Sequence, residues 1–294
     1  MNQGWANVDG NGHHWPGQPG MPPAFYGMPA DPLVSPDYAG WWQRGIALAK
    51  QVWKPSLILH AIVIVPTLAL TVPANTMFTA ESATVQEALR NGGGLPPMNG
   101  YLRAMALLMA AFLVSGLLST IATAVTVRLV VAAATGQPVS LPTALREGVR
   151  RVPALIGWGI LAGLLALGAV LACILPIVYV AAAVMVLPVV VTLERGSGIG
   201  RCFSLFHADL GTSVARIATL FGIGTVAALA LGLVGIVLEA GISGTAGVVG
   251  STVANGMYAL AAGLVLPPLL VTAYADMRSR REPFSTAYLA PRPV

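Results

Sequence analysis

The sequence predicts an all-α integral membrane protein with six transmembrane helices. Hydrophobic residues make up 56% of its 294 residues and charged residues only 9%, whereas soluble globular domains carry about 25% charged residues. Six apolar stretches approach or exceed the roughly 20 residues needed to cross a hydrocarbon core of about 30 Å. Of the 16 lysines and arginines, only Arg90 and Arg103 fall on one side of these spans, and the others fall on the opposite side.

This distribution of positive charge orients the protein. Lysine and arginine are retained on the cytoplasmic face during membrane insertion, so we expect both termini in the cytoplasm. Residues 1–40 lack the charged start and apolar core of a signal peptide, so the first span is expected to act as the insertion signal. The net charge of +5 comes from cations that flank the spans. We therefore expect them to contact anionic membrane lipids, and we expect no nucleic acid partner.

Composition divides the chain into three parts. Residues 1–38 are rich in Gly, Pro, Asn and Asp without apolar periodicity, which predicts a disordered cytoplasmic arm. Residues 39–282 hold the six-helix transmembrane domain, and residues 283–294 form a short cytoplasmic tail. Four aromatic residues are spaced along the arm: Trp5, Trp15, Phe25 and Tyr26. Aromatic side chains on a Pro/Gly-rich chain are one means of contacting a partner protein.

We place the six spans at residues 55–75, 102–127, 153–173, 177–193, 214–237 and 251–274. The second is expected to run on as a helix to Ala134. The third and fourth are joined only by residues 174–176, so they should form an antiparallel hairpin. Residues 76–100 make the one substantial external loop, in which a short helix is expected from Glu81 to Arg90.

A segment with helical periodicity and a basic face precedes each odd-numbered span. The apolar stripes of the three segments are Trp42, Ile46, Ala49 and Trp53; Leu141, Ala144, Leu145 and Val149; and Ile199, Cys202, Phe203 and Phe206. The pattern predicts three amphipathic helices that lie in the inner membrane interface. Their arginines are candidates for contact with the bundle or with lipid headgroups: Arg44, Arg146, Arg150 and Arg201.

The inner ends of the fourth and sixth spans share a short pattern, in which residues 186–192 match residues 265–272 with one insertion. Each stretch is followed by an acidic and a basic residue: Glu194 and Arg195 in the first, Asp276 and Arg278 in the second. An interfacial helix plus a helical hairpin, repeated three times, predicts a bundle with pseudo-threefold symmetry. The alternative is that apolar hairpins resemble one another by composition alone.

Glu194 and Asp276 occupy equivalent positions in this repeat. Partial desolvation there would strengthen ion pairs with arginines of the interfacial helices. We predict that the two acids clamp those helices to the bundle. The alternative is a site for a lipid headgroup or a substrate. Arg278 is a further structural or lipid-facing candidate.

No cluster of residues indicates catalysis. Phosphodiester hydrolysis needs clustered histidines and carboxylates to hold a metal and move protons. The histidines occur at positions 13, 14, 60 and 207, and none has an acidic neighbour in a metal-binding pattern. Neither a G-x-S-x-G arrangement nor a phosphate-binding glycine loop is present. We expect no catalytic residue, no cofactor, no metal site and no enzymatic activity.

Ion-coupled transport usually needs ionisable groups inside the membrane, and the centres of the predicted spans have no Asp, Glu, Lys or Arg. His60, about one turn from the cytoplasmic end of the first span, is either a packed or interface-facing residue or a proton relay. Charged residues at span ends, such as Arg216, are expected to extend toward the interface.

Prolines and glycines inside the spans each have two interpretations. Five prolines either kink the helices or expose backbone to a substrate: Pro66, Pro73, Pro188, Pro267 and Pro268. Four glycines have spacing suited to close helix packing: Gly159, Gly163, Gly232 and Gly235. That packing occurs either within the chain or between copies of it, so a homo-oligomer remains one interpretation.

Several features together resemble a family of six-helix bacterial membrane proteins. They are an amphipathic segment followed by a span, Glu-Arg-Gly at 194–196, a second basic amphipathic segment and Tyr-x-Asp-x-Arg at 274–278. The family is labelled the membrane domain of glycerophosphoryl diester phosphodiesterase, and residues 40–290 look most similar to its stand-alone actinobacterial members. Its label comes from members fused to a soluble catalytic domain. Because these residues show no such domain, the resemblance implies a multi-pass protein of the bacterial cytoplasmic (inner) membrane and does not imply hydrolysis.

Two functional hypotheses follow. The first is a non-enzymatic membrane protein that scaffolds or assists partner proteins, or organises lipid at the inner leaflet. It rests on the absence of catalytic residues together with basic amphipathic segments and an aromatic-bearing arm. The alternative is a transporter or channel for a lipid-like or small neutral solute, which would use a groove between the repeats and their proline kinks.

Overall fold

The computed structural model describes residues 31–92, 96–172, 174–242 and 244–290, which form helices and connections without any strand. The elements are α1 (Tyr38–Arg90), α2 (Asn99–Ala134), α3 (Leu141–Val149), α4 (Val152–Ala172), α5 (Ile174–Val184), α6 (Leu187–Leu193), α7 (Ile199–Phe206), α8 (Leu210–Gly241), α9 (Thr245–Arg281) and the short 3-10 helix η2 (Thr286–Leu289). Among these described residues, six helical stretches are long and apolar enough to cross a membrane: α1, α2, α4, α5 with α6, α8 and α9. The prediction of an all-helical protein with six apolar spans is confirmed, as expected for a multi-pass membrane protein.

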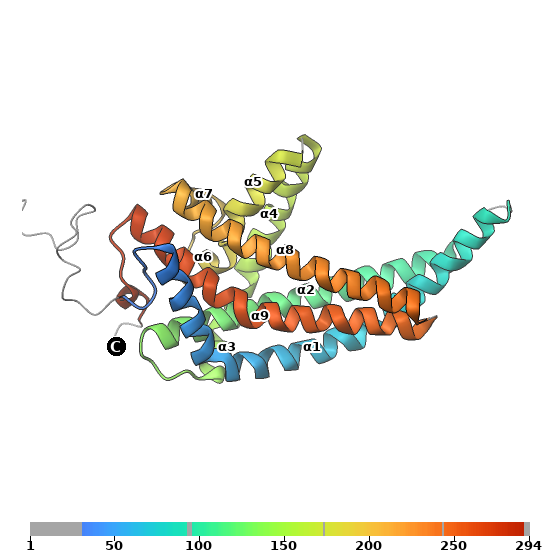
Figure 1. Ribbon diagram of the computed structural model, residues 1–294, viewed down its shortest axis with the longest axis horizontal. Helices are drawn as coiled ribbons and strands as arrows, with labels where there is room; N and C mark the ends of the chain where they lie inside the picture. Colours follow the sequence, from blue (N-terminus) through green and yellow to red (C-terminus); the bar gives the residue numbers. More distant parts are fainter. Residues whose placement is uncertain (1–30, 93–95, 173, 243, 291–294) are drawn as a thin grey trace, which may run out of the picture.

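Helix α1 is much longer than the predicted first span. It continues for 53 residues, which is about 80 Å at 1.5 Å per residue. The predicted first interfacial helix and the predicted short external helix were therefore wrong as separate elements, since both belong to α1. No glycine occurs between Ile46 and Arg90 to end the helix. Figure 1 shows that the first turns of α1, in blue, run at an angle to the rest, and Pro55 removes one backbone donor from the helix.

Residues 186–192 and 265–272, which share a sequence pattern, have different structures. Residues 185 and 186 form a turn that separates α5 from α6, and Pro188 lies in the first turn of α6. Pro267 and Pro268 instead lie inside α9, which continues past the predicted end at residue 274. The two stretches thus use their prolines differently, and the threefold repeat stays a prediction.

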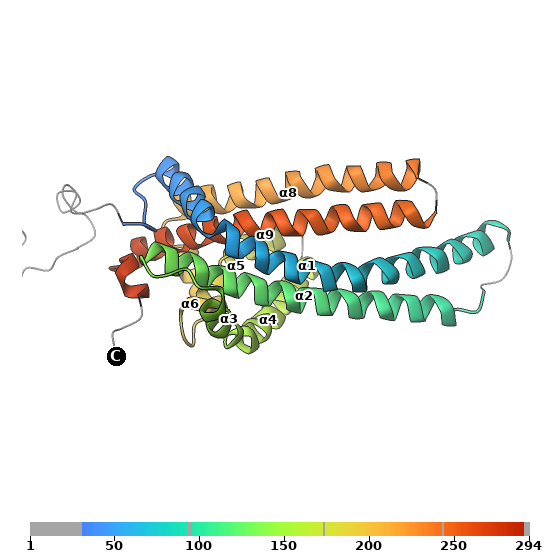
Figure 2. The same ribbon diagram turned by 90° about the horizontal axis from the view of Figure 1, so that it is seen from below.

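Six of the described helices pair as three helical hairpins. The α1–α2 and α8–α9 hairpins run side by side, whereas the α4–α5 hairpin points away from them (Figure 1). In the view of Figure 2, α8 and α9 lie along one side and α1 and α2 along the other. Helix α1 contacts both α2 and α9 and therefore joins the two long hairpins.

The hairpins meet at one end of the molecule, here named the basic end and formed by residues 31–54, 122–152, 183–217 and 267–290. The main hydrophobic core lies mostly at this end and includes Trp41, Val52, Val125, Leu129, Val189, Leu205, Ile217, Leu269 and Met277. Away from it, many large apolar side chains of α4 and α8 are exposed, including Leu164, Leu171, Leu229 and Leu233. A hydrocarbon environment would cover these surfaces.

Helices α3 and α7 lie at the second and third predicted interfacial segments. Helix α3 starts after Ser140, with Pro142 in its first turn, as the sequence pattern predicted. Helix α7 follows Gly198, whose backbone lies against the Trp158 ring of α4. The placement of both helices in a membrane interface stays a prediction.

Residues 31–37 differ from the predicted disordered arm. Leu33 and Ser35 are buried, and the Asp31 carboxylate accepts hydrogen bonds from the backbone N–H groups of Leu33 and Val34, each at 2.9 Å. A turn stabilised by Asp31 and an anchoring leucine therefore dock this stretch on the bundle. The rest of the predicted arm, residues 1–30, lies outside the described residues.

The glycines chosen from their sequence spacing do not all pack against other helices. A Cβ atom added at Gly159, Gly163 or Gly232 would meet no atom within 4 Å, whereas one at Gly235 would meet Ser251. The prediction of close packing within the chain is wrong for the first three, because the α4–α5 hairpin and the outer face of α8 stand apart from other helices.

Close packing occurs instead at Gly148, where α3 crosses α2. A Cβ atom there would lie 3.0 Å from the backbone nitrogen of Val125, so Gly148→Ala should force the helices apart. We expect a loss of about 1–3 kcal/mol in unfolding free energy, typical of overpacking, measured by denaturation in detergent. The matched control is Gly157→Ala in α4, where no atom lies near the added Cβ and alanine should be neutral or slightly stabilising. Equal stability of the two variants would contradict this packing.

Candidate functional site

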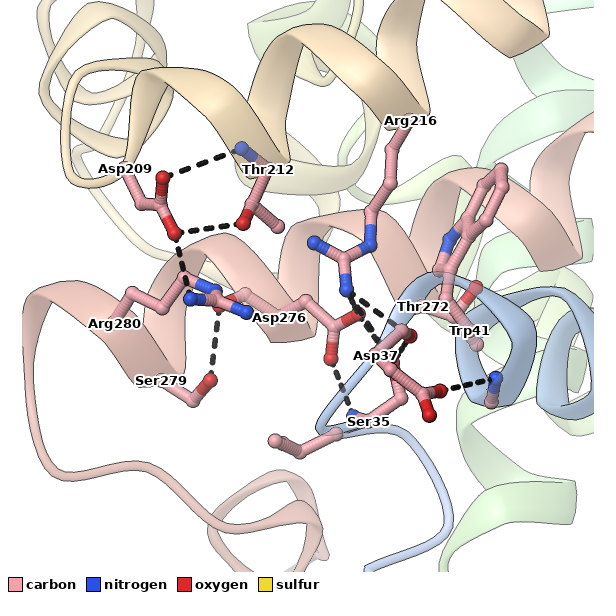
Figure 3. A network of polar contacts seen from close by, with 12 residues as sticks. Ser35, Asp37, Trp41, Asp209, Thr212, Arg216, Thr272, Asp276, Ser279 and Arg280 are labelled. Carbon is pink, nitrogen blue, oxygen red and sulfur yellow. Dashed lines mark hydrogen bonds and ion pairs between the residues drawn. The ribbon is translucent and has the colours of Figure 1, made fainter.

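The most deeply buried charges of the described structure form an ion pair at the basic end. Arg216 of α8 and Asp276 of α9 are joined by a contact of 2.8 Å between Nη2 and Oδ2, and their side chains are only 2% and 0% exposed. Asp209 caps the N-terminus of α8 by accepting a hydrogen bond from the Thr212 backbone N–H, which places Arg216 two turns into the helix. Figure 3 shows the pair between the two helices.

The segment before α1 completes this ion pair. The Ser35 backbone N–H donates to Asp276 Oδ1 at 2.5 Å, and its hydroxyl donates to Oδ2 at 2.7 Å (Figure 3). Arg216 Nη2 also lies 3.5 Å from Ser35 Oγ and from the Asp37 carbonyl oxygen. One carboxylate thus holds three separate chain segments together.

A second acid, Glu194, organises a network between α6, α7 and α9. Its carboxylate accepts from Arg201 Nε at 3.0 Å and from the Tyr274 hydroxyl at 2.7 Å. Arg278 Nη1 lies 3.6 Å from the same carboxylate and donates to the Tyr274 hydroxyl at 2.8 Å. Glu194 therefore connects the start of α7 to the last turns of α9.

Glu282 closes this network on its exposed side. It accepts from Arg201 Nη2 at 2.6 Å and from Arg278 Nε at 2.5 Å. Partial burial acts to lower the pKa of Arg201, but its bonds to Glu194 and Glu282 outweigh burial and raise that pKa above the ordinary value. The two carboxylates therefore stabilise the cationic form of Arg201.

The structure brings together only some of the predicted site residues. Glu194, Arg201 and Arg278 meet as described, with Arg201 coming from the third interfacial segment. Asp276 differs from the prediction, because its partner is Arg216 at the start of α8 and not an arginine of an interfacial helix. The expectation that Arg216 extends toward the interface is wrong, since its guanidinium points inward to Asp276.

The other predicted arginines lie apart from this cluster. Arg146 and Arg150 are exposed on and just after α3. Arg44 is half-buried, and its Nη1 atom has no partner among the described residues. Within the same residues, no group of three or more His, Cys, Asp and Glu is arranged to hold a metal ion.

His60 is buried at the crossing of three helices. Its Nε2 atom lies 3.3 Å from the Thr126 hydroxyl of α2, and its ring packs on Gly263 of α9, where a Cβ atom would overlap it. This is a packed position, as one interpretation of the sequence expected.

Sequence reasoning missed the partners supplied by residues 31–37 and by the C-terminal segment. Asp31 accepts from the Thr286 backbone N–H at 2.8 Å, from the Thr286 hydroxyl and from the Ser285 hydroxyl at 3.2 Å. Asp31 and Thr286 are 255 positions apart in the sequence. No local sequence pattern indicates that they are in contact. The Tyr-x-Asp-x-Arg motif did contain a signal, because Tyr274, Asp276 and Arg278 all enter the two networks.

Comparison with known proteins found no matching family model, curated protein or solved structure. The resemblance to the six-helix bacterial family therefore stays a prediction.

Removing one partner of the buried pair should be strongly destabilising. We expect Asp276→Ala to cost about 3–5 kcal/mol, because Arg216 would stay buried without a counter-ion. The double variant Arg216→Met with Asp276→Leu should recover part of this loss, since neither charge then remains. Unfolding in detergent measures both. Equal losses in the single and double variants would show that an unpaired arginine is not the cause.

Asp31 should make stability depend on acidity. Partial burial acts to raise its pKa, but hydrogen bonds from Thr286, Val34 and Leu33 together lower the pKa below its ordinary value of 3.8. The ionised form therefore contributes its full stability above 3.8 and loses it as the pH falls through the lowered pKa of the folded state. We expect Asp31→Asn to cost about 1 kcal/mol at neutral pH, and the difference from the unaltered chain to shrink in acid. Melting curves across this range test it, and a difference that stays constant with pH would contradict it.

Proposed function

We propose that this chain is a non-enzymatic membrane protein that acts as a scaffold at the cytoplasmic leaflet, where it holds partner proteins or organises anionic lipid. The observation that carries this proposal is the construction of the basic end. Three hairpins converge there on a common core. Ion pairs connect Glu194 to α7 and α9, and hydrogen bonds from Ser35 and Arg128 connect the α1–α2 hairpin to the other two. A fixed surface of this kind suits a protein whose task is to hold other molecules in place.

Residues 31–37 support the scaffold by fixing where the preceding residues leave the bundle. Ser35 is bonded to Asp276, and Asp31 to Thr286. The aromatic-bearing residues 1–30 therefore start from a defined position beside the C-terminal segment. A partner that bound them would be held at the basic end.

The alternative, a carrier for a lipid-like solute, is favoured by one observation. The α4–α5 hairpin points away from the other helices (Figure 1) and exposes large apolar side chains such as Leu164 and Leu167. An acyl chain could lie along such a surface. Substrate-dependent flux into liposomes would favour this alternative, because a scaffold should show none.

The partner-holding form of the proposal is tested by removing residues 1–30 only. A deletion through residue 38 would also remove Asp31 and Ser35 and damage the fold. We expect the full chain, extracted gently from its native membrane, to carry a protein that native mass spectrometry detects and that the deletion loses. The deletion should keep its melting temperature. If both forms retain anionic lipid and neither retains a protein, the lipid-organising form of the proposal remains; if neither retains anything, the scaffold is wrong.

A further inference from the structure

A concave pocket of about 510 Å³ lies at the basic end, between α2, α3 and the connection from α6 to α7. Four arginines but only one acid line it: Arg128, Arg150, Arg151, Arg195 and Glu147. The pocket is separate from the Glu194 and Asp276 networks, whose residues do not line it. Its volume falls within the range of about 300–1,000 Å³ typical of small-molecule sites.

Arg128 forms the fixed wall of this pocket. Its Nη2 atom donates to the Thr192 carbonyl oxygen at 2.6 Å, which ties α2 to the end of α6. Its Nη1 atom lies 3.7 Å from the Glu147 carboxylate, and its buried Nε atom has no partner among the described residues. The guanidinium is held in place with part of its donor capacity unused.

The other three arginines are uncompensated. No carboxylate among the described residues pairs with Arg150, Arg151 or Arg195. Arg151 and Arg195 are close enough to repel the Arg128 charge. Repulsion among these arginine charges is unfavourable, and a bound anion would reduce it.

Neutral groups complete the lining in a manner that suits an oxyanion. Gln137 and Ser140 provide an amide and a hydroxyl donor. The Thr135 and Thr143 hydroxyls also line the pocket, but they donate to the Val131 carbonyl oxygen and to Ser140 Oγ. Ser140 and Thr143 belong to the start of α3, the positive end of the helix dipole. Apolar atoms of Val131 and Leu289 cover part of the wall.

From this geometry we propose that the pocket binds a phosphate group, either that of a lipid headgroup or that of a soluble phosphate. Phosphate carries more than one negative charge and several acceptor oxygens, and arginine matches it with paired donors. One compact multivalent anion therefore meets the excess of arginines better than one carboxylate would. The inference goes beyond the proposed function, because holding a partner or a layer of lipid requires no defined phosphate pocket.

The test compares two double variants of the full chain in nonionic detergent. Arg150→Gln with Arg195→Gln removes two pocket charges and leaves Arg128, which the fold needs. Lys50→Gln with Arg281→Gln removes two exposed charges that do not line the pocket. Inorganic phosphate, glycerol 3-phosphate and short-chain phosphatidylglycerol are titrated at constant ionic strength, and the rise in melting temperature gives each affinity.

We expect the pocket variant to bind at least one probe about tenfold more weakly than the unaltered chain, as the loss of charge-assisted hydrogen bonds predicts, and the control to bind it unchanged. Binding of phosphatidylglycerol alone would identify a lipid headgroup as the source, and comparable binding of the soluble probes would identify a free phosphate. Equal weakening in both double variants would show general charge attraction and overturn the site. So would the absence of any rise in melting temperature with the three probes. Neither result depends on residues 1–30, so failure of the pocket is distinct from failure of the partner-holding scaffold. The lipid-organising form is tested separately, by retention of anionic lipid in native mass spectrometry.

Discussion

The ion pair between Arg216 and Asp276 is the interaction on which the basic end depends. Two opposite charges removed from water must be close and well hydrogen-bonded to offset their desolvation. Here the second oxygen of the carboxylate is satisfied by Ser35, which lies before α1. The orientation of α8 against α9 and the docking of the N-terminal segment are therefore coupled through one carboxylate. Undocking Ser35 would remove two hydrogen bonds from buried Asp276, and moving α8 would remove its counter-ion.

Helical geometry explains how one helix serves two networks. In α9, Tyr274 and Arg278 are four residues apart and share a face, which is directed to Glu194. Asp276 lies between them, on the opposite face, and is directed to Arg216. Residues 271–277 are all buried, so the last turns of α9 act as a central support with ion pairs on both sides.

The sequence predicts the six spans well, because hydropathy over about 20 residues is a strong signal. It predicts helix ends less well. Hydropathy divides residues 46–90 into an interfacial helix, a span and an external helix, but no residue there ends the helix, and all three belong to α1. Of the two acids singled out, Glu194 has a partner close in sequence, Arg201, which periodicity could find. The bonds from Asp276 to Ser35 and from Asp31 to Thr286 span most of the chain, and only the folded arrangement reveals them.

The proposed phosphate pocket and the Glu194 network share a structural element, so their energies should be linked. Arg128 bonds the carbonyl oxygen of Thr192, two residues before Glu194, which in turn holds α7 and α9. An anion in the pocket would reduce the repulsion on Arg128 and thereby strengthen its bond to the end of α6. Because the coupling free energy is reciprocal, an interaction that holds the end of α6 in place should favour anion binding by the same amount. In the proposed scaffold, an anion at one side of the basic end and a partner held at the other would then act on the same short helix.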